Sequence, residues 1–190
     1  NSHLMGQTMT KMLGNSAAGD KLTAGGVSMP PLQLAPRSIE ELKAQSAQAL
    51  AGDAVSPPSV HPHQIAFNVL PQVETFKDGD DYTTEERKVM AETRKILGFG
   101  DEVGISATCA RVPVISGHSE SLNVQTRDEL SPERCRELLG AAAGVTVIDE
   151  PSEGRYPTAL EGAGRDEVLV GRIRRDPSHE RCLNLWLVGD

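Results

Sequence analysis

Four polar residues in the middle of the chain have the types and spacing of a site that handles an amino acid. Arg111 and His118 flank a segment with Pro113 and Gly117, which permit a bend that brings both side chains to one pocket. An arginine presents a forked donor to a carboxylate, and a histidine exchanges protons near neutral pH. The pair therefore favours a site that holds an amino-acid carboxylate beside a proton-transfer group.

Glu85 and Lys88 form the second pair. They stand three residues apart, just after a Thr83-x-x-Glu86 capping box that is typical of a helix start, so they share one face of that helix. Such a face can meet a zwitterion or a phosphate. The alternative is a solvated ion pair and a histidine at the edge of the core, and the residues by themselves favour this alternative.

Other motifs fit their chemistry less well. The third glycine of Gly98-Phe-Gly100-Asp-Glu-Val-Gly104 is one position late for a dinucleotide loop, and the segment follows a helix, which predicts a turn. His61-Pro-His63 lacks the further ligands of a zinc site, so we expect a surface loop and no metal. Cys109 lies in an apolar run, which favours a buried thiol over a nucleophile.

The composition indicates a soluble, globular domain. The chain has 190 residues, 38% of them hydrophobic, and no apolar run near the roughly 18 residues that cross a membrane. A formal net charge of −8 argues against nucleic-acid binding, which needs a basic surface. Three widely spaced cysteines without a CxxC pair favour a reducing compartment, and we expect the cytoplasm.

The elements that would position these side chains form an α+β pattern. Capping residues and terminal glycines predict helices, and β-branched or alternating runs predict strands. We expect helices over 38–50, 84–97 and 134–143, a strand or extended segment over 65–70, and strands over 103–109, 112–116, 121–126, 145–148, 167–174 and 182–188. This grouping favours a mixed, largely antiparallel sheet with helices on one face.

The chain divides into two parts of different character. Residues 1–36 begin with Asn-Ser-His-Leu-Met, typical of a vector remnant, and contain no aromatic residue with which to build a core. We expect this segment to be peripheral or mobile. Residues 37–190 are expected to form the folded domain.

From about His63 to Asp190 the chain resembles the aspartate-semialdehyde dehydrogenase family. The matching stretches, in order, are His63-Gln-Ile-Ala-Phe-Asn-Val69, Tyr82-Thr-Thr-Glu-Glu-Arg-Lys88, Glu92-Thr-Arg-Lys-Ile96, Ser106-Ala-Thr-Cys-Ala-Arg-Val-Pro-Val114, Gly117-His-Ser-Glu120, Val170-Gly-Arg-Ile-Arg-Arg-Asp176 and Leu185-Trp-Leu-Val-Gly-Asp190. Each motif is modest, and the set in this order is specific. The resemblance implies a substrate-binding and dimerisation domain, similar to the C-terminal domain of glyceraldehyde-3-phosphate dehydrogenase-type enzymes.

The resemblance also implies an activity and a role for each site residue. Members of the family interconvert L-aspartate 4-semialdehyde and 4-aspartyl phosphate with NADP and phosphate, in the biosynthesis of lysine, threonine and methionine. By position, Arg111 resembles the arginine that grips the substrate carboxylate, and His118 resembles the catalytic acid/base. Glu85 resembles the glutamate that engages the substrate, and Lys88 resembles the phosphate-binding lysine. A homodimer is implied as well.

Parts of the family pattern have no counterpart in this sequence. The glycine-rich nucleotide-binding domain, the Asn-Cys nucleophile and the catalytic glutamine are not found, so we expect the isolated chain to be inactive and to bind no NADP. One alternative is a non-catalytic dimeric scaffold or binding protein in which residues 6–36 carry a new function. Another is a domain of an N-acetyl-glutamyl-phosphate reductase, against which the spacing of Arg111 and His118 argues.

Overall fold

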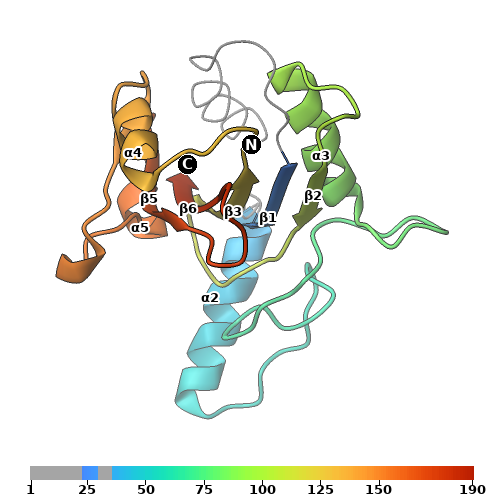
Figure 1. Ribbon diagram of the computed structural model, residues 1–190. Helices are drawn as coiled ribbons and strands as arrows, with labels where there is room; N and C mark the ends of the chain where they lie inside the picture. The colour runs from blue at the N-terminus through green and yellow to red at the C-terminus, as the bar shows by residue number, and fades with distance from the viewer. Residues whose placement is uncertain (1–22, 30–35) are drawn as a thin grey trace.

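The computed structural model describes residues 23–29 and 36–190 and shows an α+β fold (Figure 1). The strands form one sheet in the order β2-β1-β3-β6-β5-β4. The β1–β2 and β4–β5 pairs are parallel, and the other pairs are antiparallel. In chain order the elements are β1 (Thr23–Met29), α2 (Pro36–Ala51), α3 (Thr84–Leu97), β2 (Ile105–Thr108), β3 (His118–Gln125), α4 (Pro132–Gly140), β4 (Val145–Val147), the 3-10 helix η1 (Pro151–Glu153), α5 (Ala159–Gly162), β5 (Val168–Arg175) and β6 (Cys182–Gly189).

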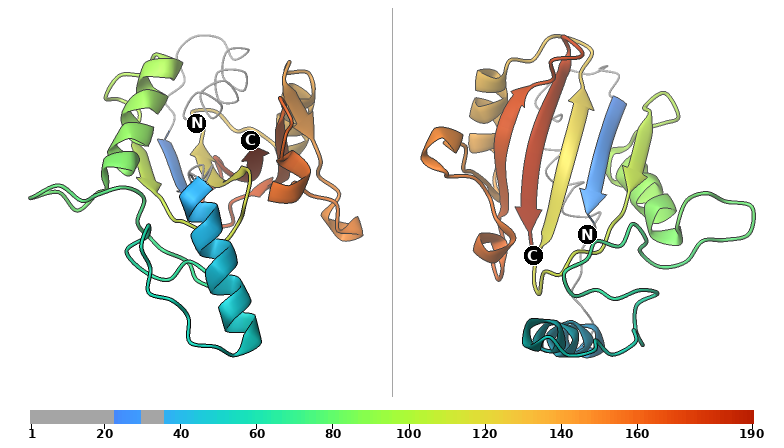
Figure 2. Two further views of the ribbon diagram at one scale, coloured as in Figure 1. Left: turned by 180° about the vertical axis from the view of Figure 1, so that it is seen from behind. Right: turned by 90° about the horizontal axis from the view of Figure 1, so that it is seen from below.

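Helices α3 and α4 pack on one face of the sheet (Figure 1). Along β3 every second residue is buried, as expected when one face of a strand meets a helix layer. The shared core contains Val89 and Met90 of α3, Cys135 and Leu139 of α4, and Leu122, Val124, Val170, Ile173, Leu185 and Leu187 of the sheet. On the opposite face, none of the described helices crosses the central strands (Figure 2, right).

Helix α2 lies beyond the ends of the strands and holds a long loop through a polar stripe (Figure 2). Gln48 bonds to Ser56, Glu41 accepts from the Ser59 amide at 2.6 Å, and Gln45 Oε1 accepts from the Ile65 amide at 3.0 Å. These three residues of α2 are four and three positions apart, so they follow one side of the helix. A small second core of Leu42, Ile65, Ala66 and Leu70 lies beneath them.

The sequence prediction of an α+β fold with a mixed, largely antiparallel sheet is confirmed, and two predicted strands are wrong. Residues 65–70 form a turn with a single bridge between Leu70 and Arg111. Residues 112–116 form bends, because Pro113 has no amide to donate to a ladder and Gly117 turns the chain at a φ of 83°. The third strand of the sheet therefore begins at His118.

The structure also places a strand within residues 1–36. Segment Thr23–Met29 is β1, which pairs with β2 on one side and with β3 on the other. Its position inside the sheet differs from the peripheral position that we expected for this part of the chain. The rest of the segment lies outside the described residues, so the domain division at residue 36 stays a prediction.

We expect Gly171→Ala to lower the free energy of unfolding by about 1–3 kcal/mol, as chemical denaturation would show. A methyl group at Gly171 would overlap with the carbonyl oxygen of Ile148 and lie 2.6 Å from Cδ of Pro157, and backbone atoms cannot move aside cheaply. Gly140→Ala is the control, since a methyl group there meets nothing within 4 Å and Gly140 lies in α4. An equal loss in both variants would contradict the packing argument.

Candidate functional site

The first turn of α3 positions Glu85 and Lys88. Thr83 caps the helix with an extended φ of −70° and ψ of 160°, and its side chain accepts from the Glu86 amide. Glu85 is buried, while the Lys88 side chain is 54% exposed, and Lys88 Nζ lies 3.5 Å from Glu85 Oε2. An accessible ammonium near the positive end of a helix is a favourable setting for a phosphate.

Arg111 is held at the site by its own backbone. Its amide donates to the Leu70 carbonyl at 2.8 Å, and its carbonyl accepts from the Leu70 amide at 2.9 Å. Burial lowers the pKa of Arg111, and the charges of Glu85 and Glu74 oppose that shift. A guanidinium keeps its proton at any physiological pH, so Arg111 presents a partly desolvated cation toward these two carboxylates.

His118 is the first residue of β3 and is buried, with 4% of its surface exposed. Burial lowers the pKa of its imidazole to about 4, and nearby Asp190 and the Gly189 backbone oppose the shift. The imidazole is therefore neutral at pH 7. Two residues further on the same face of β3, burial raises the pKa of Glu120 to about 7.

Three of the four predicted site residues form one electrostatic group. Glu85 is in contact with Lys88 and acts on the charge of Arg111, although α3 and Arg111 are far apart in sequence. The charged neighbour of His118 is instead Asp190. Cys109 connects the Glu85 group with the surroundings of His118. The charges of Glu86 and Glu85 on α3 and of Glu120 on β3 all raise the pKa of its thiol.

None of the three cysteines has the properties of a nucleophile. Cys109 is fully buried, and burial together with the Glu86 charge raises its pKa to about 12. Burial likewise raises the pKa of Cys135 to about 12 and increases the pKa of Cys182. The reactive form of cysteine is the thiolate, which these surroundings disfavour near neutral pH.

Sequence reasoning missed two residues beside this group. His61 was predicted to lie in a surface loop, but its side chain is buried. Burial lowers the pKa of His61, and the charge of Arg111 lowers it further. Glu86 was recognised only as part of a capping box, but it also bonds to the amide of Cys109 at 2.8 Å. The capping motif identified Glu86, whereas its second contact crosses 23 residues of chain and leaves no local signal.

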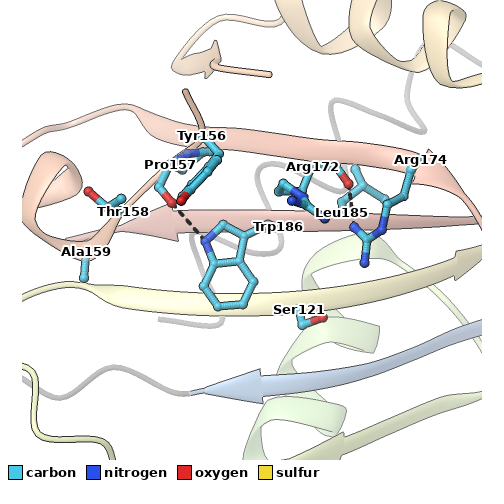
Figure 3. Close-up of a pocket in the computed structure, with 9 residues that line it drawn as sticks. All are labelled: Ser121, Tyr156, Pro157, Thr158, Ala159, Arg172, Arg174, Leu185 and Trp186. Atoms are coloured by element: carbon cyan, nitrogen blue, oxygen red, sulfur yellow. Dashed lines mark hydrogen bonds between the residues drawn. The ribbon is translucent and has the colours of Figure 1, made fainter. Parts of the chain in front are cut away.

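A separate pocket of about 570 Å³ lies on the open face of the sheet (Figure 3). It is lined by Ser121, Tyr156, Pro157, Thr158, Ala159, Arg172, Arg174, Leu185 and Trp186. The Trp186 indole donates to the Pro157 carbonyl at 3.1 Å, which fixes one edge of its ring. None of the four predicted site residues lines this pocket.

The glycine-rich segment 98–104 does not fit a dinucleotide. Gly98 is the left-handed cap that ends α3, and the Gly100 amide donates to the carboxylate of Glu102 at 3.0 Å. A carboxylate on that amide would repel a pyrophosphate. Residues 101 and 102 form a turn, which confirms the prediction of a turn in this segment. Over residues 23–29 and 36–190 there is also no group of three potential metal ligands. Within the same ranges, no helix combines the length and apolar character of a membrane span.

Comparison with known proteins gives a consistent result. Residues 35–190 match the family model described as semialdehyde dehydrogenase, dimerisation domain. The aspartate-semialdehyde dehydrogenase of Aquifex aeolicus is 47% identical over 154 residues, covering 81% of this chain and 45% of that protein. The Bacillus subtilis enzyme of the same name is 38% identical over 161 residues, covering 80% of this chain and 46% of that protein.

Solved structures agree with the sequence comparison. The crystal structure of aspartate semialdehyde dehydrogenase II from Vibrio cholerae complexed with ASA has a TM-score of 0.86 and 31% identity, covering 100% of this chain and 55% of that one. The chain thus spans about half the length of the relatives that it matches. Because the family model covers most of the sequence, this chain belongs to the semialdehyde dehydrogenase dimerisation-domain family.

Proposed function

We propose that this chain is the substrate-binding and dimerisation part of an aspartate-semialdehyde dehydrogenase. The observation that carries the proposal is the group formed by Glu85, Lys88 and Arg111, in which a buried carboxylate contacts an exposed ammonium and acts on the charge of a partly buried guanidinium. These charges complement a substrate that carries an amino group, a carboxylate and a phosphorylated end. The similarity to the Vibrio cholerae enzyme in complex with ASA supports the same assignment.

Each residue has a distinct role in this proposal. Arg111 grips the substrate α-carboxylate with a planar, partly desolvated fork, which strengthens the pairing. Glu85 engages the substrate, and Lys88 binds the attacking or leaving phosphate at the start of α3. His118 is the acid/base residue, whose buried neutral imidazole is able to accept a proton.

The complete reaction requires groups that this chain does not supply. In the complete enzyme NADP would supply the hydride chemistry. The glycine-rich segment 98–104 of this chain does not suit a pyrophosphate, because the Glu102 carboxylate accepts from the Gly100 amide. No cysteine here has the character of the thiolate nucleophile. We therefore expect the isolated chain to be inactive, with the cofactor held elsewhere in the complete enzyme.

The proposed assembly is a homodimer formed through the open face of the sheet. The matching family model is a dimerisation domain, and this face presents the Trp186 pocket (Figure 3). The net charge of −8 supports small-molecule and protein partners over nucleic acid or a membrane surface. Three free, buried cysteines support the cytoplasm as the compartment.

Complementation tests the proposed activity. The purified chain is expected to produce no NADPH from L-aspartate 4-semialdehyde and phosphate by itself. It is expected to do so when the part of the Aquifex aeolicus relative that this chain does not cover is added. In the complemented enzyme, Arg111→Ala should lower kcat/KM roughly 100-fold, because a buried charge pair with the substrate is lost. Absorbance at the NADPH band provides the rate.

Arg134→Ala is the matched control for this experiment. Arg134 is an exposed arginine on α4 that pairs with Glu137 at 2.8 Å, and its removal should leave kcat/KM unchanged. Turnover of N-acetyl-glutamate semialdehyde in place of aspartate semialdehyde would indicate the reductase. Silence under all conditions, with both pieces shown to fold and associate, would support the scaffold.

A further inference from the structure

Glu86 connects two segments of the candidate site through both of its carboxylate oxygens. Oε2 accepts from the Thr83 amide at 2.8 Å, which closes the capping box of α3. Oε1 accepts from the amide of Cys109, also at 2.8 Å. The side chain is buried, with 6% of the residue exposed, so water does not compete effectively for either bond.

The second bond exceeds what a helix cap requires. A capping box needs one oxygen of the glutamate, for the amide of the N-cap residue. The other oxygen of Glu86 reaches 23 residues along the chain to Cys109, two residues before Arg111. On the helix side, Glu86 directly follows Glu85 and precedes Lys88 by two positions.

Other contacts fix the distance between the first turn of α3 and the segment before Arg111 less directly. The Arg111 backbone is bonded to Leu70, and Leu70 belongs to the small core under α2 and not to the core of α3. Val89 attaches α3 to the sheet through apolar packing, which is less directional than a hydrogen bond. Glu86 is thus the polar link, among the described residues, between the first turn of α3 and the segment that leads to Arg111.

We propose that Glu86 is a positioning residue that sets the spacing between the Glu85–Lys88 pair and Arg111. This inference rests on the proposed function of those three residues. Glu86 touches no substrate in this scheme. It holds the phosphate-binding and carboxylate-binding ends at a separation that matches one ligand with both groups, and such a ligand binds more tightly than its parts only when the spacing is correct.

The test uses the full chain and the variant Glu86→Leu. Leucine has an apolar side chain of similar size but offers no acceptor oxygen, so both bonds of the Glu86 carboxylate are lost. The probes are O-phospho-L-serine, which carries a carboxylate and a phosphate, and inorganic phosphate alone. Calorimetry should show about tenfold weaker binding of O-phospho-L-serine and unchanged binding of phosphate.

Amide hydrogen exchange tests the geometry independently of any ligand. In Glu86→Leu the Cys109 amide should exchange at least tenfold faster, while the Leu70 amide, which bonds to Arg111, keeps its protection. Thr83→Ala is the matched control, because it removes the hydroxyl cap of the same helix and leaves the Glu86–Cys109 bond in place. It should change neither the Cys109 amide nor the affinity for O-phospho-L-serine.

The outcomes separate this inference from the proposed function. Equal effects of Thr83→Ala and Glu86→Leu, or a parallel loss of phosphate binding, would overturn the positioning role in favour of a simple cap. If the unmodified chain binds neither probe, the proposed function fails. The exchange rate of the Cys109 amide then tests the link by itself, and an unchanged rate in Glu86→Leu would refute it.

Discussion

Trp186→Asp is expected to convert the proposed dimer into monomers at micromolar concentration. Sedimentation velocity over a concentration series would show the dissociation constant rising roughly a thousandfold or more. A buried interface tryptophan commonly contributes a few kcal/mol, and a two-fold axis counts each substitution twice. The introduced carboxylate also loses its hydration at the centre of the interface.

The pairing of β6 with its two neighbouring strands explains why Trp186 is the residue to substitute. Its partners in the register are Ser121 on β3 and Gly171 on β5, both of which have short side chains or none. The indole is therefore not covered by its partners in the ladder, and it is half-buried beside Pro157 on the open face (Figure 3). Its bond to the Pro157 carbonyl holds the ring in place before a partner arrives, which lowers the entropy cost of association.

Two further variants make the dimer prediction decisive. Arg134→Asp is the control, because Arg134 is an exposed residue of α4, which packs on the opposite face of the sheet (Figure 1). It should leave the dimer intact. Ser121→Glu places a charge beside Trp186 without removing the indole, and should also give a folded monomer. Dimers that persist in both sheet variants would exclude this face as the interface.

The elements that were predicted well depend on local chemistry. Helix α3 begins after the Thr83 cap and ends at Gly98, where a φ of 66° suits a residue without a side chain. Strands β5 and β6 carry their own alternating or continuous apolar pattern, so their bounds are close to the predicted ones. Where a few adjacent residues determine an element, the sequence is sufficient.

The features that were missed depend on partners distant in sequence. Strand β1 has the glycine-rich sequence TAGGVSM, and its place in the sheet comes from pairing with β2 and β3. The candidate site likewise contains one contact between neighbours in sequence and others between distant segments. The i, i+3 spacing predicted the contact of Glu85 with Lys88, whereas the contact of Glu86 with Cys109 and the burial of Glu120 required the folded chain.

Glu120→Gln is expected to stabilise the chain at alkaline pH and not at acid pH. Burial raises the pKa of Glu120 from 4.5 to about 7, so the folded state retains a proton that the unfolded state releases. Its contribution to stability is present in full below about pH 4.5 and is lost as the pH rises through about 7. The total loss is about 3 kcal/mol. Glutamine resembles the protonated acid and does not titrate.

Urea unfolding at pH 5 and pH 8, at one protomer concentration, measures this difference. The advantage of Glu120→Gln over the unmodified chain should grow by about 2–3 kcal/mol between the two conditions. His118 acts in the opposite direction: its pKa is lowered to about 4, so its contribution is lost as the pH falls below about 6.5. The contribution of His118 is present in both proteins and cancels in the comparison.

Glu137→Gln is the control, because the Glu137 side chain is 64% exposed. Its effect on the free energy of unfolding should be the same at pH 5 and pH 8. A constant difference between Glu120→Gln and the unmodified chain would mean that Glu120 is ionised in the fold, and that the carboxyl beside His118 carries a full charge at neutral pH.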